Sequence, residues 1–309
     1  MSRVAIFFLL VLVCSIGLVP AGPIETGLAQ IERYEYAAAR RTLEPVLDDP
    51  ARAGEALILI TRSYNGTENY EQGIEYGKRA VAALPASSEA QLQYAVALRN
   101  RLARVSKTRG LFLLGGYKSA LRKALELDPK NLDAREEELG FLMHAPSIAG
   151  GSMGTAGERA AELKSLDWLR GTRVTAELRE LEGDFAGAEA LWVAALKKYP
   201  GDAESHLMLG QGYQREGRYR EAEAHFLELS GKEDLRFLLW GKYGLGSSRV
   251  LGSYEPDTAV NYLKEYLVKL RDVFPDLPSR SEGNEMLGRA YEQLDNQAAR
   301  KALAGLPAD

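Results

Sequence analysis

Cysteine and histidine are scarce in this 309-residue chain. It holds one cysteine, Cys14, and three histidines, His144, His206 and His225. A single cysteine excludes a disulfide framework, and so few Cys and His ligands exclude a structural zinc cluster. An excess of positive charge is also absent, because 39 Lys and Arg face 43 Asp and Glu. The net charge of −4 lacks the basic field of a nucleic-acid binder, so we predict no nucleic-acid partner.

The motifs of common enzyme classes are absent as well. The sequence has no Gly-x-Ser-x-Gly elbow and no His-Glu-x-x-His segment. A glycine-rich stretch near residues 150–157 is no phosphate loop, because Glu158 follows Gly157 where lysine is needed. His206 and His225 lie in helical patterns and are expected to be packing residues. We therefore predict no catalysis and no cofactor or metal.

What the chain does have begins with an N-terminal leader pattern. Arg3 precedes an apolar run, Val4 to Val13, and small residues follow as far as Ala21. This order is that of a secretory signal peptide. We predict that residues 1–21 are cleaved and that residues 22–309 are exported to the periplasm or the outer face of a membrane.

Two alternatives for the leader stay open. The first is an uncleaved membrane anchor, although the apolar segment 4–19 is shorter than the roughly 20 residues that span a bilayer. The second is lipid attachment at Cys14, which is disfavoured by Val13 because a lipoprotein signal has a small residue at that place.

Beyond the leader, small residues recur with a period of 34. Ala176 and Gly210 are 34 apart, and so are Ala188 and Ala222. Bulky residues flank each of them at helical spacings. This pattern predicts pairs of antiparallel helices, because only small residues let two helix axes come close where they cross. A lone pair cannot bury its apolar face, so successive pairs must stack.

The pattern resembles the tetratricopeptide repeat, most closely in the segment Ala-Leu-Glu-Leu-Asp-Pro-Lys-Asn at 124–131. The resemblance covers about residues 27–305. It implies an all-α, right-handed solenoid of stacked antiparallel helix pairs, about seven repeats plus a partial C-terminal one. It further implies a concave groove that binds a peptide or protein surface. Pro45 predicts a kink or early end in the first pair, and Glu138 and Trp168 depart from the pattern in the repeat 129–168.

Two consecutive repeats are longer than the period. Pro85 and Pro129 are 44 apart, and Pro129 and Trp168 are 39 apart, against a period of 34. The register of the flanking helices places the extra residues near 99–117 and 145–154, at the turn within each helix pair. Equivalent turns lie along one edge of a solenoid, so we expect the two insertions to be neighbours.

The first insertion is strongly basic. Residues 99–123 contain eight Lys and Arg and no acid, and they include the apolar run 111–114. One interpretation is a long helix with a solvated basic face, whose apolar run fills a widened core. The other is a site for an acidic partner or an anionic lipid surface. The partner-binding residues of this second interpretation are Arg101, Arg104, Lys107 and Arg109.

The groove set follows from the register of the first helix of each pair. These residues are polar or aromatic, which suits peptide backbone and carboxylates. The set is Arg62, Asn65, Arg99, Arg173, Gln211, Gln214, Arg215, Trp240 and Tyr243, with Leu92, Leu207, Glu177 and Glu180 on the same face. We predict a non-catalytic interaction scaffold or adaptor of the cell envelope that binds through this groove. The alternative is a membrane-surface assembly factor that docks through residues 99–123. The sequence sets no oligomeric state.

Overall fold

A computed structural model describes residues 21–304 except 68, 103, 272–273 and 275, with side chains also left undescribed at 107–109 and 297–304. The predicted leader therefore lies almost wholly outside the described residues. The part that is described is helical and contains no β-strand. The helices are α1 (Pro23–Glu32), α2 (Tyr36–Leu43), α3 (Ala53–Asn65), α4 (Tyr70–Ala83), α5 (Ser88–Leu102), α6 (Lys107–Leu127), α7 (Leu132–His144), α8 (Met153–Leu166), α9 (Trp168–Leu181), α10 (Phe185–Lys198), α11 (Ala203–Arg215), α12 (Tyr219–Ser230), α13 (Leu235–Gly252), α14 (Pro256–Lys269) and α15 (Arg280–Ala304), with short 3-10 turns η1 (Glu44–Asp48) and η2 (Ser147–Ala149).

Consecutive helices pack as antiparallel pairs, from α1 with α2 to α13 with α14, and α15 closes the series. The prediction of an all-α solenoid of about seven pairs plus a partial one is confirmed. Ala176, Ala188 and Ala222 have no exposed surface, and Gly210 is buried against the ring of Phe226. These small residues therefore lie at the close helix contacts that the period of 34 predicts.

The turns within pairs follow from local sequence. Gly183 and Gly217 both have positive φ, 82° and 74°, which glycine adopts without steric cost. Pro45 acts as predicted, because α2 ends at Leu43 and the chain continues as the 3-10 turn η1. Asp167 both ends α8 and accepts a hydrogen bond from the Arg170 N–H at the start of α9, so no proline is needed there.

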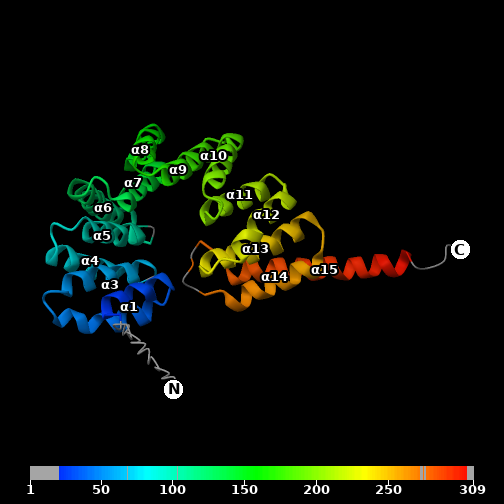
Figure 1. The fold of residues 1–309 in the computed structure, drawn as a ribbon, viewed down its shortest axis with the longest axis horizontal. Helices are drawn as coiled ribbons and strands as arrows, with labels where there is room; N and C mark the ends of the chain where they lie inside the picture. The colour runs from blue at the N-terminus through cyan, green and yellow to red at the C-terminus, as the bar shows by residue number, and fades with distance from the viewer. Residues whose placement is uncertain (1–20, 68, 103, 272–273, 275, 305–309) are drawn as a thin grey trace, which may run out of the picture.

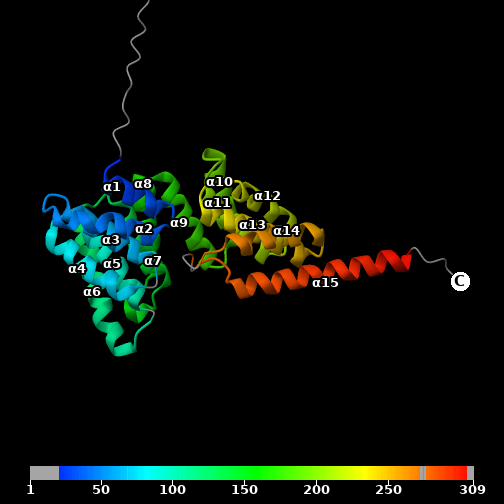
Figure 2. The ribbon, with the colours of Figure 1, turned by 90° about the horizontal axis from the view of Figure 1, so that it is seen from below.

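The stacked pairs form an arch (Figure 1). Helices α7, α9 and α11 lie on its inner side, whereas α8 and α10 lie outside. The segment after α14 returns to the turn between α1 and α2, where Tyr34 contacts Asp234 and Phe274. Figure 2 shows that the first turns of α6 and the distal half of α15 project from the body. The arch is thus closed at its base by contacts between its two ends.

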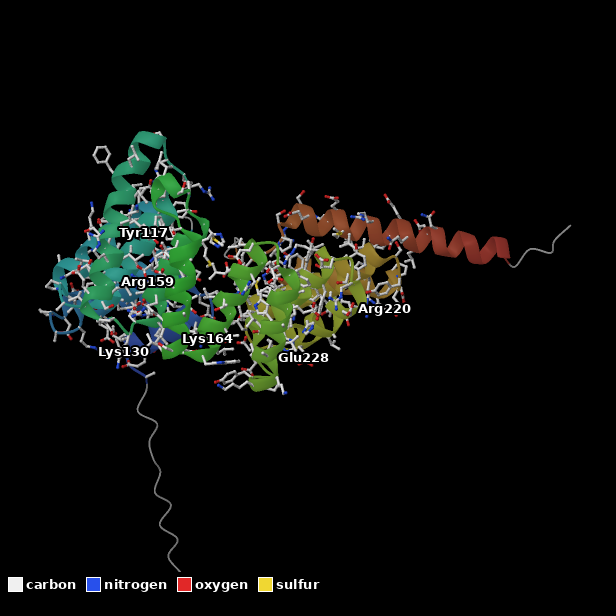
Figure 3. The ribbon with its side chains drawn as sticks, turned by 90° about the horizontal axis from the view of Figure 1, so that it is seen from above. Tyr117, Lys130, Arg159, Lys164, Arg220 and Glu228 are labelled. Atoms are coloured by element: carbon white, nitrogen blue, oxygen red, sulfur yellow. The ribbon has the colours of Figure 1, made fainter. Side chains whose placement is uncertain are left out.

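The packing is weakest between α6 and α7, which contact each other less than any other consecutive helices. A cleft of about 440 Å³ opens there, with Tyr117 of α6 and Arg159 of α8 among its lining residues (Figure 3). Glu138, the predicted departure from the apolar pattern, lies in this cleft 3.8 Å from Arg159. Burial raises the pKa of the Glu138 carboxyl. The loose junction thus coincides with a carboxylate at a repeat position where an apolar residue was expected.

The second insertion contacts α6 beside this cleft, at Lys118, one residue beyond the bounds of the first insertion. Gly150, in the 145–154 segment, has φ of 105°, and the ammonium of Lys118 lies against it. The same ammonium lies 5.2 Å from the ring of Phe141. The segment between α7 and α8 thus rests on α6, the helix that the first insertion lengthens to 21 residues.

Candidate functional site: the inner wall of the arch

The inner wall is the face formed by the first helix of each pair. Two side-chain amides that the sequence predicted to contact a partner in the groove, those of Asn65 and Gln214, form hydrogen bonds between helices. The Nδ2 atom of Asn65 donates to the backbone O and the Oε1 of Gln93, both at 2.9 Å. The Nε2 atom of Gln214 donates to the hydroxyls of Ser247 at 2.9 Å and Ser248 at 2.7 Å. These donors are therefore engaged in joining α3 to α5 and α11 to α13.

The predicted arginines of the wall are held by carboxylates of neighbouring pairs. The Nε of Arg99 lies 3.0 Å from Glu137, and the Nη1 of Arg173 lies 3.5 Å from Asp202. Arg215 forms an ion pair with Glu180. Of the remaining predicted polar residues, Arg62 is exposed and Gln211 is half-buried.

The aromatic pair Trp240 and Tyr243 packs against the C-terminal segment. The indole Nε1 of Trp240 donates to Asp276 at 3.1 Å, and the ring of Tyr243 lies 5.2 Å from that of Tyr266. The expectation that Leu92 and Leu207 face the groove is wrong, because both are 2% exposed. Both leucines belong to core clusters instead.

The basic insertion is partly neutralised. The Nη2 of Arg101 lies 2.6 Å from Glu71, and the guanidinium of Arg104 lies 5.7 Å from the ring of Tyr70. The side chains of Lys107 and Arg109 lie outside the described residues. The expectation that the whole run 111–114 fills the core is wrong, because Leu111 is 70% and Phe112 81% exposed. Leu113 and Leu114 do pack against the core.

A pocket of about 310 Å³ opens on the inner wall between α7, α9 and α11. It exists because α9 and α11 scarcely contact each other, although they belong to adjacent pairs. Met143 and Met208 line it from α7 and α11, and we call it the Met143–Met208 pocket. Trp192 of α10 also lines it and is fully buried, so its indole forms the floor. The Nε1 of Trp192 has no hydrogen-bond partner among the described residues.

Carboxylates outnumber cations around this pocket. Its lining holds Glu136, Glu177 and Glu204 but one guanidinium, that of Arg173, within the part of the chain that the structure describes. Burial raises the pKa of the Glu136 carboxyl, against the opposing effect of Arg170. The pocket is therefore an acidic recess with thioether walls.

Gly140 leaves space at the rim of the pocket. It lies in the interior of α7, and a Cβ added to it would meet no atom within 4 Å. Glycine inside a helix costs about 1 kcal/mol relative to alanine. Arg173 and Glu177, which the repeat register placed on the groove face, both line the pocket, and the helix-interior glycine is a further sequence signal that points to it. The Met143–Met208 pair and the Trp192 floor carry no such signal, because methionine and tryptophan are ordinary core residues.

The two repeat histidines form a hydrogen-bonded pair. His206 Nε2 lies 2.9 Å from the Pro200 carbonyl O, so it carries the proton and donates. His206 Nδ1 then accepts from His225 Nδ1–H at 3.0 Å. Burial, with a smaller effect of His206, lowers the pKa of His225 to about 4. His225 is thus neutral at neutral pH, and both imidazoles are hydrogen-bonded packing groups, as predicted.

The described residues contain no cluster of His, Cys, Asp and Glu suited to a metal ion. Among the same residues, no helix has the length and apolar character needed to cross a bilayer.

Known proteins resemble this chain in fold. No protein-family model matches the sequence, and no curated protein matches it either. Among solved structures, the tetratricopeptide repeat protein TTC0263 of Thermus thermophilus is 20% identical with a TM-score of 0.54, over 62% of this chain and 97% of that one. A tetratricopeptide repeat protein of Parabacteroides merdae is 12% identical with a TM-score of 0.57, over 87% and 97%. Yeast Tom70 is 16% identical with a TM-score of 0.53, over 92% and 67%. The chain therefore has the tetratricopeptide-repeat fold.

Proposed function

We propose that this chain, a solenoid of tetratricopeptide-repeat fold, is a non-catalytic scaffold that binds a partner polypeptide on its inner wall. The observation that carries the proposal is the Met143–Met208 pocket itself, a recess of about 310 Å³ on the inner wall that two methionines and the open position of Gly140 line. Flexible thioether walls adapt to the side chains of a partner.

The test is a photo-crosslinking experiment in cells. The residue p-benzoylphenylalanine replaces Met208 in the pocket or, as a control, Leu227, which is 58% exposed on α12. We expect a defined adduct from position 208 and none from position 227. Gly140→Leu fills the pocket and is expected to lower the yield at position 208 at least fivefold. Gly157→Leu, at another open helix position on α8, leaves it unchanged. An adduct from 227 alone, or a yield that Gly140→Leu does not change, contradicts the proposal.

The setting of this scaffold is also a proposal. The order of residues 1–21, a basic start followed by an apolar run and small residues, supports export to the periplasm or the outer face of a membrane. Fractionation of cells, with N-terminal sequencing of the mature protein, tests it. We expect a mature chain that begins at Gly22 in the exported fraction, and a cytoplasmic full-length chain contradicts the proposal.

A second function is favoured by the exposed tip of α6. Leu111 and Phe112 lie on turns that project from the body (Figure 2) and are mostly exposed. An apolar tip flanked by basic residues suits an anionic membrane surface. The ion pair between Arg101 and Glu71 reduces the charge available for it. Flotation with vesicles that contain phosphatidylglycerol tests this function: we expect binding that Phe112→Glu abolishes, and equal binding of the variant contradicts it.

A further inference from the structure

The charge around the Met143–Met208 pocket narrows the chemistry of its occupant. Among the described residues, Arg173 lines the pocket, and Arg170 and Arg236 pair with its lining carboxylates Glu136 and Glu204. These three guanidiniums are outnumbered by six carboxylates. Three of the carboxylates line the pocket, namely Glu136, Glu177 and Glu204, and three more pair with the guanidiniums, namely Asp133, Asp202 and Asp276. An anionic occupant would meet this excess of negative charge and be repelled, whereas a cation is attracted to it.

Two of the three lining glutamates form ion pairs with arginines, whereas the third is bonded to a histidine. Arg170 lies 3.1 Å from Glu136, and Arg236 lies 3.4 Å from Glu204. Among the described residues, Glu177 has a hydrogen bond at 3.1 Å to His144, an exposed imidazole, and no guanidinium within ion-pair distance. Glu177 is thus the lining carboxylate most ready to accept an ion pair from a ligand.

The remaining walls suit the aliphatic part of a basic side chain. Met143 and Met208 are half-buried thioethers, and Gly140 leaves open space beside them. Lysine and arginine carry three or four methylene groups that pack on such surfaces while the charged end finds its partner.

We propose that the Met143–Met208 pocket receives a lysine or arginine side chain of a partner polypeptide, whose charged end pairs with Glu177. This rests on the proposed function, since it specifies which partner chemistry the inner wall selects. The chain would then select partners by the position of a lysine or arginine within the extended segment that lies along the inner wall.

The test uses nuclear magnetic resonance on the whole chain. The protein has five methionines and three tryptophans, so methyl-labelled methionine and indole-labelled tryptophan give few, assignable signals. The probes are capped pentapeptides with two alanines on each side of a central arginine, norleucine or glutamate. We expect the arginine peptide to shift the Met143, Met208 and Trp192 signals in a saturable way. Met286, on α15, serves as the internal reference and is expected to stay in place.

The expected selectivity is at least tenfold in Kd for the arginine peptide over the norleucine peptide, with weakening at high salt. Glu177→Gln keeps the side-chain size and is expected to weaken the arginine peptide at least threefold. Gly140→Leu abolishes its binding, whereas the matched Gly157→Leu variant does not. Absence of shifts, equal affinity for the norleucine peptide, or preference for the glutamate peptide overturns the inference.

These failures are distinguishable from failure of the proposed function. If position 208 still forms the crosslink that Gly140→Leu lowers, the inner wall binds a polypeptide even when the arginine peptide shows no preference. If the crosslink is lost as well, both proposals fail together.

Discussion

The hydroxyl of Tyr34 donates to the carboxylate of Asp234, 200 residues later in the chain, at 2.9 Å. Asp234 is also the N-cap of α13, where its side chain accepts from backbone N–H groups. The ring of Tyr34 meets that of Phe274 edge-on at 4.6 Å between centroids. Tyr34 holds this position with φ of 60°, in the left-handed region. Burial, and then Asp234, raise the pKa of the Tyr34 hydroxyl, so it remains a donor.

This contact is expected to keep the arch closed. Tyr34→Phe removes one hydrogen bond to a carboxylate, and Tyr34→Ala also removes the packing on Phe274. We expect a loss of about 1 kcal/mol for Tyr34→Phe, since the bond is exposed to solvent. We expect Tyr34→Ala to raise the radius of gyration, measured by small-angle X-ray scattering. Tyr291→Ala, on α15, is the matched control. Identical scattering of the native chain, Tyr34→Ala and Tyr291→Ala would contradict the role of Tyr34 in keeping the arch closed.

The pKa of His225 predicts a dependence of stability on pH. Its folded value is about 4 against 6.5 for an ordinary histidine. Between these values the unfolded chain binds more protons, so the contribution is complete above pH 6.5 and is lost as the pH falls towards 4. We expect a loss of about 2 kcal/mol, allowing for partial exposure. Urea unfolding at about pH 7.5 and about pH 4.5 measures it. His225→Gln should remove this part of the slope and the exposed His144→Gln should keep it; equal slopes would refute the assignment.

Substitution by alanine is expected to have opposite effects on stability at Gly171, which is crowded, and at Gly140, which is open. At Gly171 of α9, an added Cβ would overlap the Lys164 backbone of α8, so Gly171→Ala must separate two helices. We expect it to cost about 2 kcal/mol or more, on the order of other overpacked sites. At Gly140 the space is open, so Gly140→Ala is expected to stabilise by about 0.5–1 kcal/mol. Thermal unfolding measures both. A Gly171→Ala variant as stable as the native chain would show that the crossing is not tight, and a destabilised Gly140→Ala variant would contradict the open space at Gly140.

The hydrogen bonds from Asn65 to Gln93 predict which of two substitutions at Asn65 destabilises the fold more. Asn65→Ala removes the donor to Gln93, at a cost of about 1 kcal/mol. Asn65→Asp places carboxylate oxygens opposite the Gln93 carbonyl, which cannot donate, and is expected to cost about 2 kcal/mol at neutral pH. Chemical denaturation at neutral pH ranks them, and raising the acidity to protonate the aspartate should narrow the gap. An alanine variant less stable than the aspartate variant would contradict the bridge.

The repeat architecture could be predicted from sequence because its causes are local. Ala176 and Gly210 mark helix contacts, and Pro45 marks the end of α2, through steric rules that operate within a few residues. The repeat around Glu138 was the exception to the pattern, and it is the one with the weakest packing against its neighbour. Departures from a repeat consensus thus indicated where the stacking changes.

The inner wall could be predicted only in part, because its partners depend on how repeats stack. The residue pattern places Arg215 on the first helix of its pair, but its partner Glu180 comes from the preceding pair. Leu92 and Leu207 show that the repeat register does not separate core positions from wall positions, because both leucines are buried. The Trp192 floor depends on the gap between α9 and α11, and the contact of Tyr34 with Asp234 depends on the accumulated curvature of all the pairs. Such features require the three-dimensional structure.

The thin packing between α6 and α7 has a mechanical consequence. In a stack where each pair touches only its neighbours, bending concentrates at the softest joint. The junction between α6 and α7 divides the solenoid into two parts, α1–α6 and α7–α15. The hydrogen bond from the Tyr34 hydroxyl to the Asp234 carboxylate links their far ends. Breaking the Tyr34–Asp234 hydrogen bond would allow one part to rotate about α7 and would increase the distance between the two ends of the arch. The width of the arch is therefore set by a contact far from the junction at which the arch bends.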